Sequence, residues 1–333
     1  MITQQKRILG QYFTKSDFWL KDHILNFIKS SKARIAFDPF AGDGDLLKAA
    51  EEIGFKTVRG FDIDPSFGWE QNDSLLHIPK IENSLILTNP PYLTNYSAKR
   101  KGIYENVGKY FDSCEYDDLY QLAIEKCLAN DFGVMIVPET FINSTFPKNR
   151  LASITIIEDM LFRDTENPVC VICFDSRQKS YDEIKIYKND MPLGNLAQYE
   201  RQRKYPTNNF SIKFNCPTGQ IALRAVDTTD PQKLIAFMKP EHLDYDLSTI
   251  KESSRMITLI EVAADNALID KLIHQSNKIL GEFREKTHDI LLSPFKGNKK
   301  NGERRRRLDY FTARAILEDA HDIILANREY LRV

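Results

Sequence analysis

Residues 34–44 read Arg-Ile-Ala-Phe-Asp-Pro-Phe-Ala-Gly-Asp-Gly, and they carry the clearest signal of fold class in the sequence. Arg34–Phe37 is a short β-like run that ends in a glycine-rich turn. Asp45–Ile53 follows with apolar residues at helical spacing, and Gly54 suits a helix C-cap. Such a strand–turn–helix unit lets the backbone approach a ligand closely. Because neither Gly-Lys-Ser/Thr nor G-x-G-x-x-G is present, the turn is not a P-loop or a dinucleotide fingerprint.

The first half of the chain continues to alternate strand and helix signals. Short apolar runs between turn residues mark strands, and apolar residues three and four apart mark helices. This alternation is typical of a parallel sheet wound with helices. The expected strands are Thr57–Phe61, Leu85–Thr88, Val134–Val137 and Val169–Phe174, and the expected helix is Leu119–Leu128.

The residue composition of the sequence changes near residue 190. Pro192–Asn209 is polar and rich in turn residues, which suggests a domain boundary. Beyond it, Ala267–Phe283 and Ala313–Tyr330 have the spacing of amphipathic helices. We therefore expect an α/β protein, with a Rossmann-like sheet in residues 1–190 and a smaller, helix-rich domain in residues 191–333.

The composition excludes several classes of protein. Hydrophobic residues make up 42% of the 333 residues and charged residues 28%, as in an ordinary globular protein. No apolar run reaches the roughly 18 residues that span a bilayer. Met1–Ile8 lacks the apolar core of a secretion signal. We expect a cytoplasmic protein with no membrane partner.

The cysteines and histidines do not indicate a metal site. Five cysteines are too few and too scattered for a disulfide framework. Cys170 and Cys173 form a C-x-x-C, but they lie in a strand-like run, where residues three apart point to opposite faces. The six histidines form no cluster in the sequence. We expect no metal and interpret both cysteines as core residues.

Three acidic residues follow successive strands of the expected sheet. Asp38 ends the first strand, Asp62 closes the second about 20 residues later, and Asp73 lies in the next loop. Each alone could be a surface acid. Together they would line the carboxyl edge of the sheet, where α/β proteins bind ligands. There Asp38 suits a positive amino or sulfonium group, Asp62 two ribose hydroxyls, and Asp73 an adenine amino group.

Asn89-Pro90-Pro91-Tyr92 directly follows the strand Leu85–Thr88. An exocyclic amine on a base ring is a poor nucleophile, because its lone pair is delocalised into the ring. The Asn89 side-chain oxygen and the Pro90 carbonyl can hold its two N–H bonds and favour a pyramidal nitrogen. The prolines fix φ near −65° and keep this corner rigid, and Tyr92 offers a flat face to an extruded base. A proline turn that merely ends a strand would not explain the flanking amide and aromatic.

With these motifs, residues 8–175 resemble the gamma-ordered adenine-N6 DNA methyltransferases. The resemblance implies an S-adenosylmethionine methyltransferase sheet, that cofactor, and a flipped-out adenine as the target. It assigns catalysis to Asn89, Pro90, Pro91 and Tyr92, with Phe162 stacking the base against Tyr92. The cofactor residues that the motifs and the resemblance indicate are Tyr12, Thr14, Asp38, Phe40, Ala41, Gly42, Gly44, Asp62, Ile63, Asp73 and Asn89.

The N-P-P-Y motif identifies a planar amine or amide but not the molecule that carries it. Methylation of an RNA base or a protein glutamine remains an alternative, and so does a silent module that only binds nucleic acid. One feature that favours DNA is Gly10–Thr14, which resembles the N-terminal motif of the adenine-N6 DNA methyltransferases. Glutamine methyltransferases begin instead with a helical domain, which we do not expect here. A C-terminal region of about 140 residues is also large enough to lie along a duplex.

Basic residues occur where contacts to double-stranded DNA are expected. Tyr199–Lys204 and Lys296–Arg307 fall in the second domain, although such runs are often only solvated surface. We expect a monomer that methylates DNA and pairs functionally with a separate restriction endonuclease. The expected phosphate contacts are Lys99, Arg100 and Lys101, in a loop over the flipped base, and Arg304, Arg305, Arg306 and Arg307.

Overall fold

The computed structural model describes residues 16–158, 167–246 and 256–330. The chain divides into two compact units, Met1–Gln198 and Tyr199–Val333. No helix in the described ranges is both long enough and apolar enough to cross a bilayer.

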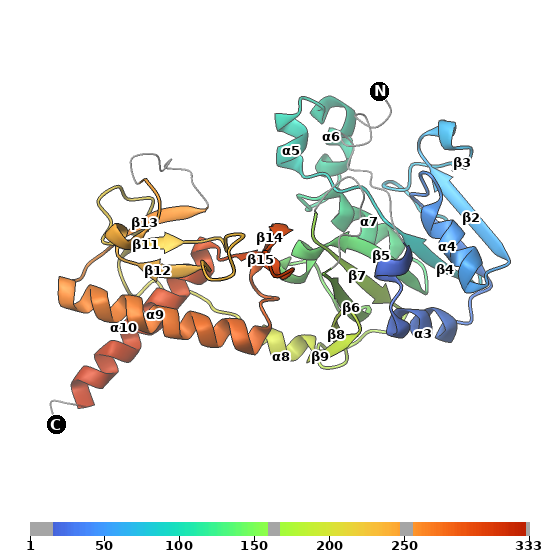
Figure 1. Cartoon of the computed structure of the whole chain (residues 1–333). Helices are drawn as coiled ribbons and strands as arrows, with labels where there is room; N and C mark the ends of the chain where they lie inside the picture. The colour runs from blue at the N-terminus through green and yellow to red at the C-terminus, as the bar shows by residue number, and fades with distance from the viewer. Residues whose placement is uncertain (1–15, 159–166, 247–255, 331–333) are drawn as a thin grey trace. The chain divides into compact units, whose positions relative to one another are not determined.

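The first unit is built on a sheet of nine described strands in the order β3-β2-β1-β4-β5-β7-β6-β8-β9 (Figure 1). Neighbouring strands from β3 to β5 are parallel, whereas β7 runs antiparallel to both β5 and β6. The predicted Rossmann-like α/β fold is confirmed. The strands are β1 (Ile35–Asp38), β2 (Thr57–Asp62), β3 (Glu70–Gln71), β4 (Ser84–Thr88), β5 (Gly133–Pro138), β6 (Leu151–Ile157), β7 (Val169–Phe174), β8 (Lys185–Lys188) and β9 (Met191–Asn195).

The two helices that the sequence predicts in this unit, at Asp45–Ile53 and Leu119–Leu128, begin and end close to the predicted residues, whereas the other helices were not predicted. Helix α4 spans Asp45–Ile53 as predicted. It stops at Gly54, whose φ of 113° is disfavoured for residues with a Cβ, and the Gly54 N–H caps the Ala50 and Glu51 carbonyls. The other helices are α2 (Ser16–Trp19), α3 (Asp22–Ser30), α5 (Asn95–Arg100), α6 (Tyr104–Asp112), α7 (Leu119–Cys127) and α8 (Leu196–Glu200), and the 3-10 turns are η1 (Pro65–Phe67) and η2 (Glu139–Asn143).

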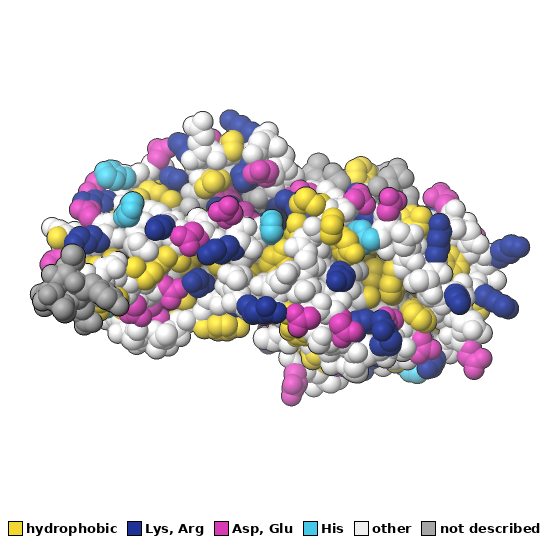
Figure 2. Space-filling model, turned by 90° about the horizontal axis from the view of Figure 1, so that it is seen from below, with side chains coloured by type: hydrophobic (Ala, Val, Ile, Leu, Met, Phe, Trp, Pro, Cys, Tyr) yellow, Lys and Arg dark blue, Asp and Glu magenta, His cyan; other side chains and the backbone are white. Residues whose placement is uncertain are grey.

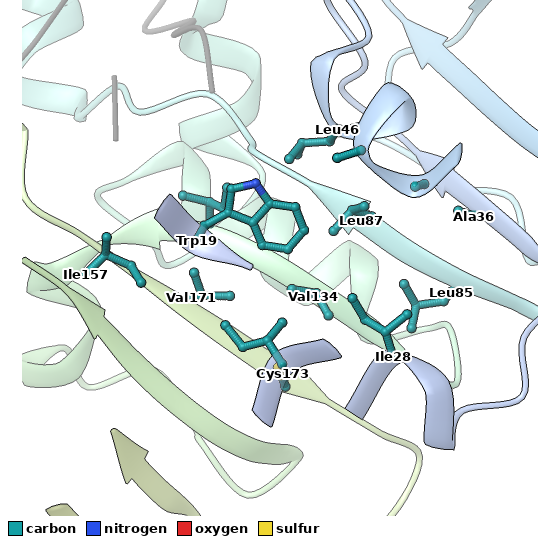
Figure 3. Close-up of a cluster of buried hydrophobic side chains, with 14 of the residues drawn as sticks. Trp19, Ile28, Ala36, Leu46, Leu85, Leu87, Val134, Ile157, Val171 and Cys173 are labelled. Carbon is teal, nitrogen blue, oxygen red and sulfur yellow. The ribbon is translucent and has the colours of Figure 1, made fainter. Parts of the chain in front are cut away.

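A buried apolar cluster joins one face of the sheet to α2, α3 and α4 (Figure 3). Trp19 is fully buried against alternate residues of the central strands, among them Leu87, Val134 and Val171. Alternation places these strand side chains on the same face. A second cluster joins α5, α6 and α7 to the loops after β3 and β4. The two clusters fix the loops at the carboxyl ends of the strands.

Cys170 and Cys173 both lie in β7 and are fully buried. Neither forms a disulfide, and Cys173 belongs to the core cluster around Trp19. The interpretation of this C-x-x-C as part of the core is confirmed.

The second unit combines two long helices with short antiparallel strands. The predicted amphipathic helices are present as α9 (Asn266–Thr287) and α10 (Tyr310–Tyr330), which pack against each other. The strands were not predicted. They form a sheet in the order β10-β13-β11-β12 and a separate hairpin of β14 and β15. The bounds are β10 (Ile212–Phe214), β11 (Ile221–Arg224), β12 (Ala236–Met238), η3 (Pro240–His242), β13 (Ile257–Val262), β14 (Ser293–Asn298) and β15 (Arg304–Arg307).

A buried carboxylate ties several elements of this second unit together. Asp227 is fully buried and forms two parallel hydrogen bonds with the Arg284 guanidinium of α9, at 2.9 and 3.0 Å. Its oxygens also accept the backbone N–H groups of Ile235 and Arg306. Burial alone would raise the pKa of Asp227, but Arg284 and these N–H groups outweigh it and lower the pKa.

Candidate active site

Four polar side chains lie at the carboxyl ends of four adjacent strands. Asp73 follows β3, Asp62 ends β2, Asp38 ends β1 and Asn89 follows β4. Since these strands are neighbours in the order β3-β2-β1-β4, the side chains follow one another along a single edge of the sheet. All four line one pocket of about 320 Å³. The structure therefore brings the three predicted acids together with the start of the N-P-P-Y motif.

The rest of the pocket wall is largely apolar. A volume of this size lies at the lower end of the range for small-molecule sites, which commonly combine an apolar lining with a few polar groups. Of the predicted cofactor residues, Phe40, Ala41, Gly42 and the half-exposed Ile63 also line it. The lining residues that are not among the predicted site residues are Pro39, Asp43, Asp45, Leu46, Phe67, Asn72, Ser74, Leu75, Leu93, Asn106, Val107, Tyr110 and Leu119.

Asp38 lines the pocket and is buried, with an exposure of only 2%. Its Oδ1 accepts the Phe40 N–H at 2.9 Å and the hydroxyl of Thr88, the last residue of β4. Burial raises the pKa of Asp38 to about 7, although these two donors partly offset the effect. Both donors are neutral, so a cation in the pocket would find a carboxylate whose charge is not yet compensated.

Asp62 holds the glycine-rich turn in place. Its Oδ2 accepts the Gly42 N–H and its Oδ1 accepts the Asp64 N–H, both at 2.9 Å. Burial raises the pKa of Asp62, and these two backbone groups act against that shift. Since each carboxylate oxygen can accept more than one hydrogen bond, this arrangement leaves capacity for hydroxyl donors of a ligand.

Gly44, a predicted cofactor residue, is not among the residues that line the pocket. It adopts φ +77°, and a Cβ there would lie 2.7 Å from the Trp69 ring. The Trp69 indole N–H in turn donates to the Gly42 carbonyl at 2.8 Å. Gly60 also requires the absence of a Cβ, which would lie 2.5 Å from the same ring. Trp69 thus fixes the turn, a role that no local sequence pattern reveals.

The N-P-P-Y segment forms a corner that contributes to the pocket through Asn89 and Pro91. Pro90 is buried, and the half-buried Tyr92 packs against the core cluster around Trp19. The Tyr92 hydroxyl lies 2.5 Å from Asn89 Oδ1 and 2.9 Å from the Ile136 carbonyl of β5, so its single proton can go to either acceptor. These contacts orient the Asn89 amide. The predicted stacking of a base on Tyr92 stays a prediction.

Helix α6 closes one side of the pocket with Asn106, Val107 and Tyr110. The Tyr110 hydroxyl donates to Asp73 Oδ2 at 2.9 Å, and the Lys109 ammonium donates to the same oxygen at 3.0 Å. Tyr110 is buried, whereas the Lys109 side chain is 55% exposed. The only sequence signal for these residues is their place shortly after the N-P-P-Y motif.

Three predicted site residues, Tyr12, Thr14 and Phe162, lie outside the described residues. No group of three His, Cys, Asp or Glu side chains that could hold a metal ion occurs within the described part of the chain.

The predicted phosphate contacts of the first unit are exposed. Lys99 and Arg100 lie at the end of α5 rather than in a loop, and Lys101 follows directly. The Lys99 ammonium lies 4.9 Å from the centre of the Tyr104 ring, and the Arg100 guanidinium 5.8 Å from that of Tyr96. These contacts leave the charged groups at the surface, where an anion can reach them.

The predicted four-arginine phosphate clamp is wrong for Arg304 and Arg306. These alternate residues of β15 are buried, with exposures of 5% and 2%. Arg305 stacks on the Phe295 ring at 4.8 Å and donates to the Asp227 carbonyl at 2.8 Å, whereas Arg307 is half-buried. A strand with one face packed inside the protein hides every second side chain, which a run of identical residues does not reveal.

The other basic segment of the second unit is partly paired within the protein. Arg203 forms an ion pair with Glu200, and Lys204 forms one with Asp319, each at 2.6 Å. On the face of the molecule drawn in Figure 2, Lys and Arg side chains alternate with Asp and Glu and do not gather by sign.

No protein-family model and no curated protein sequence matches this chain. Solved structures with a similar fold include a candidate class I S-adenosylmethionine-dependent methyltransferase from Listeria monocytogenes, with 15% identity and a TM-score of 0.35. That alignment covers 50% of this chain and 63% of the other.

Two further structures show the same kind of similarity. One is the modification subunit of a candidate type I restriction enzyme from Vibrio vulnificus, with 14% identity, a TM-score of 0.37, and coverage of 56% of this chain and 49% of that one. The other is a candidate RNA methyltransferase from Pyrococcus horikoshii, with 17% identity, a TM-score of 0.33, and coverage of 53% and 90%. At these values the similarity says nothing about substrate or activity.

Proposed function

We propose that this protein is an S-adenosylmethionine-dependent methyltransferase that methylates N6 of a flipped-out adenine in double-stranded DNA. The observation that carries the proposal is the row Asp73, Asp62, Asp38 and Asn89 along one edge of the sheet, within one pocket. Asp73 offers an acceptor to an adenine amino group, and Asp62 offers one to the ribose hydroxyls. Asp38 faces the cationic chain of the cofactor, and Asn89 accepts from the target amine.

The pocket suits this cofactor by the chemistry of its walls. Asp38 and Asp62 supply negative charge, and the neutral donors on Asp38 leave that charge available to an ammonium or sulfonium group. Leu75, Leu93 and Val107 supply apolar surface for a purine ring. S-adenosylmethionine, when bound, supplies a methyl group on a positively charged sulfur that departs as a neutral thioether.

The corner at Asn89 supplies the geometry for attack. Its side-chain oxygen and the Pro90 carbonyl accept the two N–H bonds of the target amine, which directs the nitrogen lone pair towards the methyl group. The new N–C bond forms as the methyl–sulfur bond breaks, and the amine then loses one proton to water. Rigid placement lowers the barrier because the reacting groups do not have to be ordered during the reaction. No general base is assigned.

The remaining roles follow from this reaction. Residues 1–190 hold the cofactor and carry out the transfer, and residues 191–333 recognise the DNA target. Lys99, Arg100 and Lys101 contact phosphates near the flipped base. The natural setting is restriction–modification, in which a monomeric methyltransferase protects host DNA from a separate endonuclease.

One labelling experiment tests the proposal against its rivals. The protein is incubated with S-adenosylmethionine carrying a tritiated methyl group and, in parallel, with duplex DNA, RNA and a protein extract. We expect label in DNA, recovered as N6-methyladenine after digestion. Label only in RNA or only in glutamine would reject the DNA assignment, and no label in any sample would favour a silent binding module.

The Asn89→Ala variant tests the proposed corner in the same assay. We expect turnover to fall by about 10²–10³-fold, the usual loss when one preorganised polar contact to the reacting group is removed. Cofactor affinity, measured by calorimetry, should stay within about threefold, since the carboxylates are unchanged. An equal loss of turnover and affinity would make Asn89 a structural residue instead.

A further inference from the structure

Asp73 has two oxygens in unequal surroundings. Oδ2 accepts hydrogen bonds from both Lys109 and Tyr110, at 3.0 and 2.9 Å. Within the described residues, no group donates to Oδ1. The side chain is 22% exposed and lines the pocket, as does Tyr110. One oxygen is therefore held by helix α6, and the other retains its full capacity to accept.

Tyr110 is built into this arrangement more firmly than Lys109. It is only 5% exposed and belongs to the apolar cluster of α5, α6 and α7, so its ring has little freedom to turn. The Lys109 side chain is 55% exposed, and an ion pair so open to solvent contributes little. The buried phenol therefore fixes the direction of the Asp73 carboxylate.

We infer that Tyr110 is a positioning residue that makes the pocket selective for a purine with a 6-amino group. The inference rests on the proposed function, because it takes the ligand to be an adenosine derivative. An ionised carboxylate only accepts hydrogen bonds. Asp73 Oδ1 pairs with an amino group on the purine and repels a 6-oxo group at the same place. Tyr110 keeps Oδ2 engaged, so the carboxylate cannot rotate away from this contact.

The test compares two nucleosides that differ only at this position, S-adenosylhomocysteine and S-inosylhomocysteine. Calorimetry gives their dissociation constants for the wild-type protein and for Tyr110→Phe, which removes only the hydroxyl. We expect the wild type to prefer the 6-amino compound by at least about tenfold, and the variant to lose about three- to tenfold of that preference. Tyr104→Phe is the matched control, since its hydroxyl bonds to Asp112 on the outer part of the same helix.

The ratio of affinities separates positioning from general damage. A purely structural defect in Tyr110→Phe would weaken both nucleosides equally and leave the ratio unchanged, and that result would overturn the inference. If the wild type bound neither nucleoside, the proposed function itself would fail, and the inference with it. An unchanged ratio with intact binding of S-adenosylhomocysteine would reject only the inference.

Asp73→Asn provides a second, sharper measurement. Lys109 and Tyr110 are both donors towards Oδ2, so they should hold the oxygen of the new amide and turn its NH2 group to the place of Oδ1. We expect this variant to prefer S-inosylhomocysteine, whose 6-oxo group accepts from that NH2. Retained preference for the 6-amino compound would contradict the orienting role of Tyr110.

Discussion

Two buried aspartates, one in each unit, show how differently the protein uses the same side chain. Asp38 ends β1 in the first unit and is 2% exposed, whereas Asp227 lies after β11 in the second and is fully buried. Asp227 binds the Arg284 guanidinium, and its pKa is lowered. Among the described residues, only the Thr88 hydroxyl and the Phe40 N–H donate to Asp38, and burial raises its pKa to about 7.

The difference shows how a structural carboxylate can be told from one that awaits a ligand. Burying a charged carboxylate costs free energy at both places. Among the described residues, a positively charged partner offsets this cost at Asp227 but not at Asp38. Asp38 lines a pocket instead, so the missing positive charge can come from a bound molecule. Strongly shifted pKa values next to a cavity are typical of functional sites.

Removing the compensated carboxylate should destabilise the protein most. Asp227→Ala leaves Asp289 as the acidic partner of Arg284 within the described residues, and it removes the carboxylate that accepts from the Ile235 and Arg306 N–H groups. We expect the free energy of unfolding to fall by about 3–5 kcal/mol, as measured when buried pairs are broken. Urea denaturation followed by fluorescence and circular dichroism measures the change.

The control for this prediction is Asp244→Ala in the same unit. Asp244 pairs with Lys233, but its side chain is 72% exposed, so its removal should change stability very little. If both variants unfolded at the same urea concentration, the Asp227–Arg284 ion pair would not stabilise the second unit as its geometry indicates.

Removing the uncompensated carboxylate should instead cost ligand binding. Asp38→Asn keeps an acceptor for Thr88 and Phe40 but loses the charge that attracts a cation. We expect S-adenosylmethionine to bind about ten- to a hundredfold more weakly, the range for a lost charge-assisted contact. Unfolding free energy near pH 7 should be unchanged or higher, because a buried charge has been removed. A large loss of stability would show that Asp38 is structural, like Asp227.

The two aspartates should respond to pH in opposite directions. Asp38 has a pKa of about 7 in the folded state against 3.8 in the unfolded chain, so the folded protein binds more protons between these values. Its contribution to stability therefore declines as pH rises from about 4 to 7. The pKa of Asp227 is lowered, so its contribution is present above 3.8 and is lost as pH falls through its folded-state pKa.

Cofactor affinity provides the readout for this difference. Only the ionised form of Asp38 attracts a cation, so affinity for S-adenosylmethionine should rise about tenfold from pH 6 to pH 8 and then level off. Asp38→Asn should abolish most of this dependence, with a remainder due to Asp62, whose pKa is also raised. A wild-type affinity that is flat across this range would show that Asp38 does not face the cationic part of the ligand.

The sequence predicts the sheet and the row of acids because both depend on local order. A parallel βα arrangement places successive strand ends at one edge, so Asp38, Asp62 and Asn89 could be placed together without knowing any contact. Sequence patterns found five of the nine strands of the first unit (β1, β2, β4, β5 and β7) and the two long helices of the second, but they missed β3, β6, β8 and β9. Strands β10, β11, β12 and β15 carry only three or four residues, too few for a pattern to emerge, whereas β13 and β14 are as long as β2 and were missed all the same.

The parts that the sequence does not predict depend on contacts between distant segments. Trp69 reaches Gly42 across 27 residues, and Tyr110 reaches Asp73 across 37. No spacing rule links such pairs, because tertiary packing creates them. The same reason explains the error at Arg304 and Arg306, since the buried face of β15 is set by its neighbours and not by its own four identical residues.

The smallest expected effect extends the contrast from carboxylates to arginines. Arg100 is exposed at the end of α5, whereas Arg305 already donates to Asp227 and stacks on Phe295. Log affinity for a DNA duplex falls linearly with log salt, and each phosphate contact steepens this slope by about 1. If phosphate contact requires a guanidinium with no other hydrogen-bond partner, Arg100→Ala should make the slope shallower by about 1. Arg305→Ala should leave that slope unchanged. Fluorescence anisotropy between 50 and 200 mM salt measures both slopes, and a reversed order would mean that β15, not α5, lies against the DNA backbone.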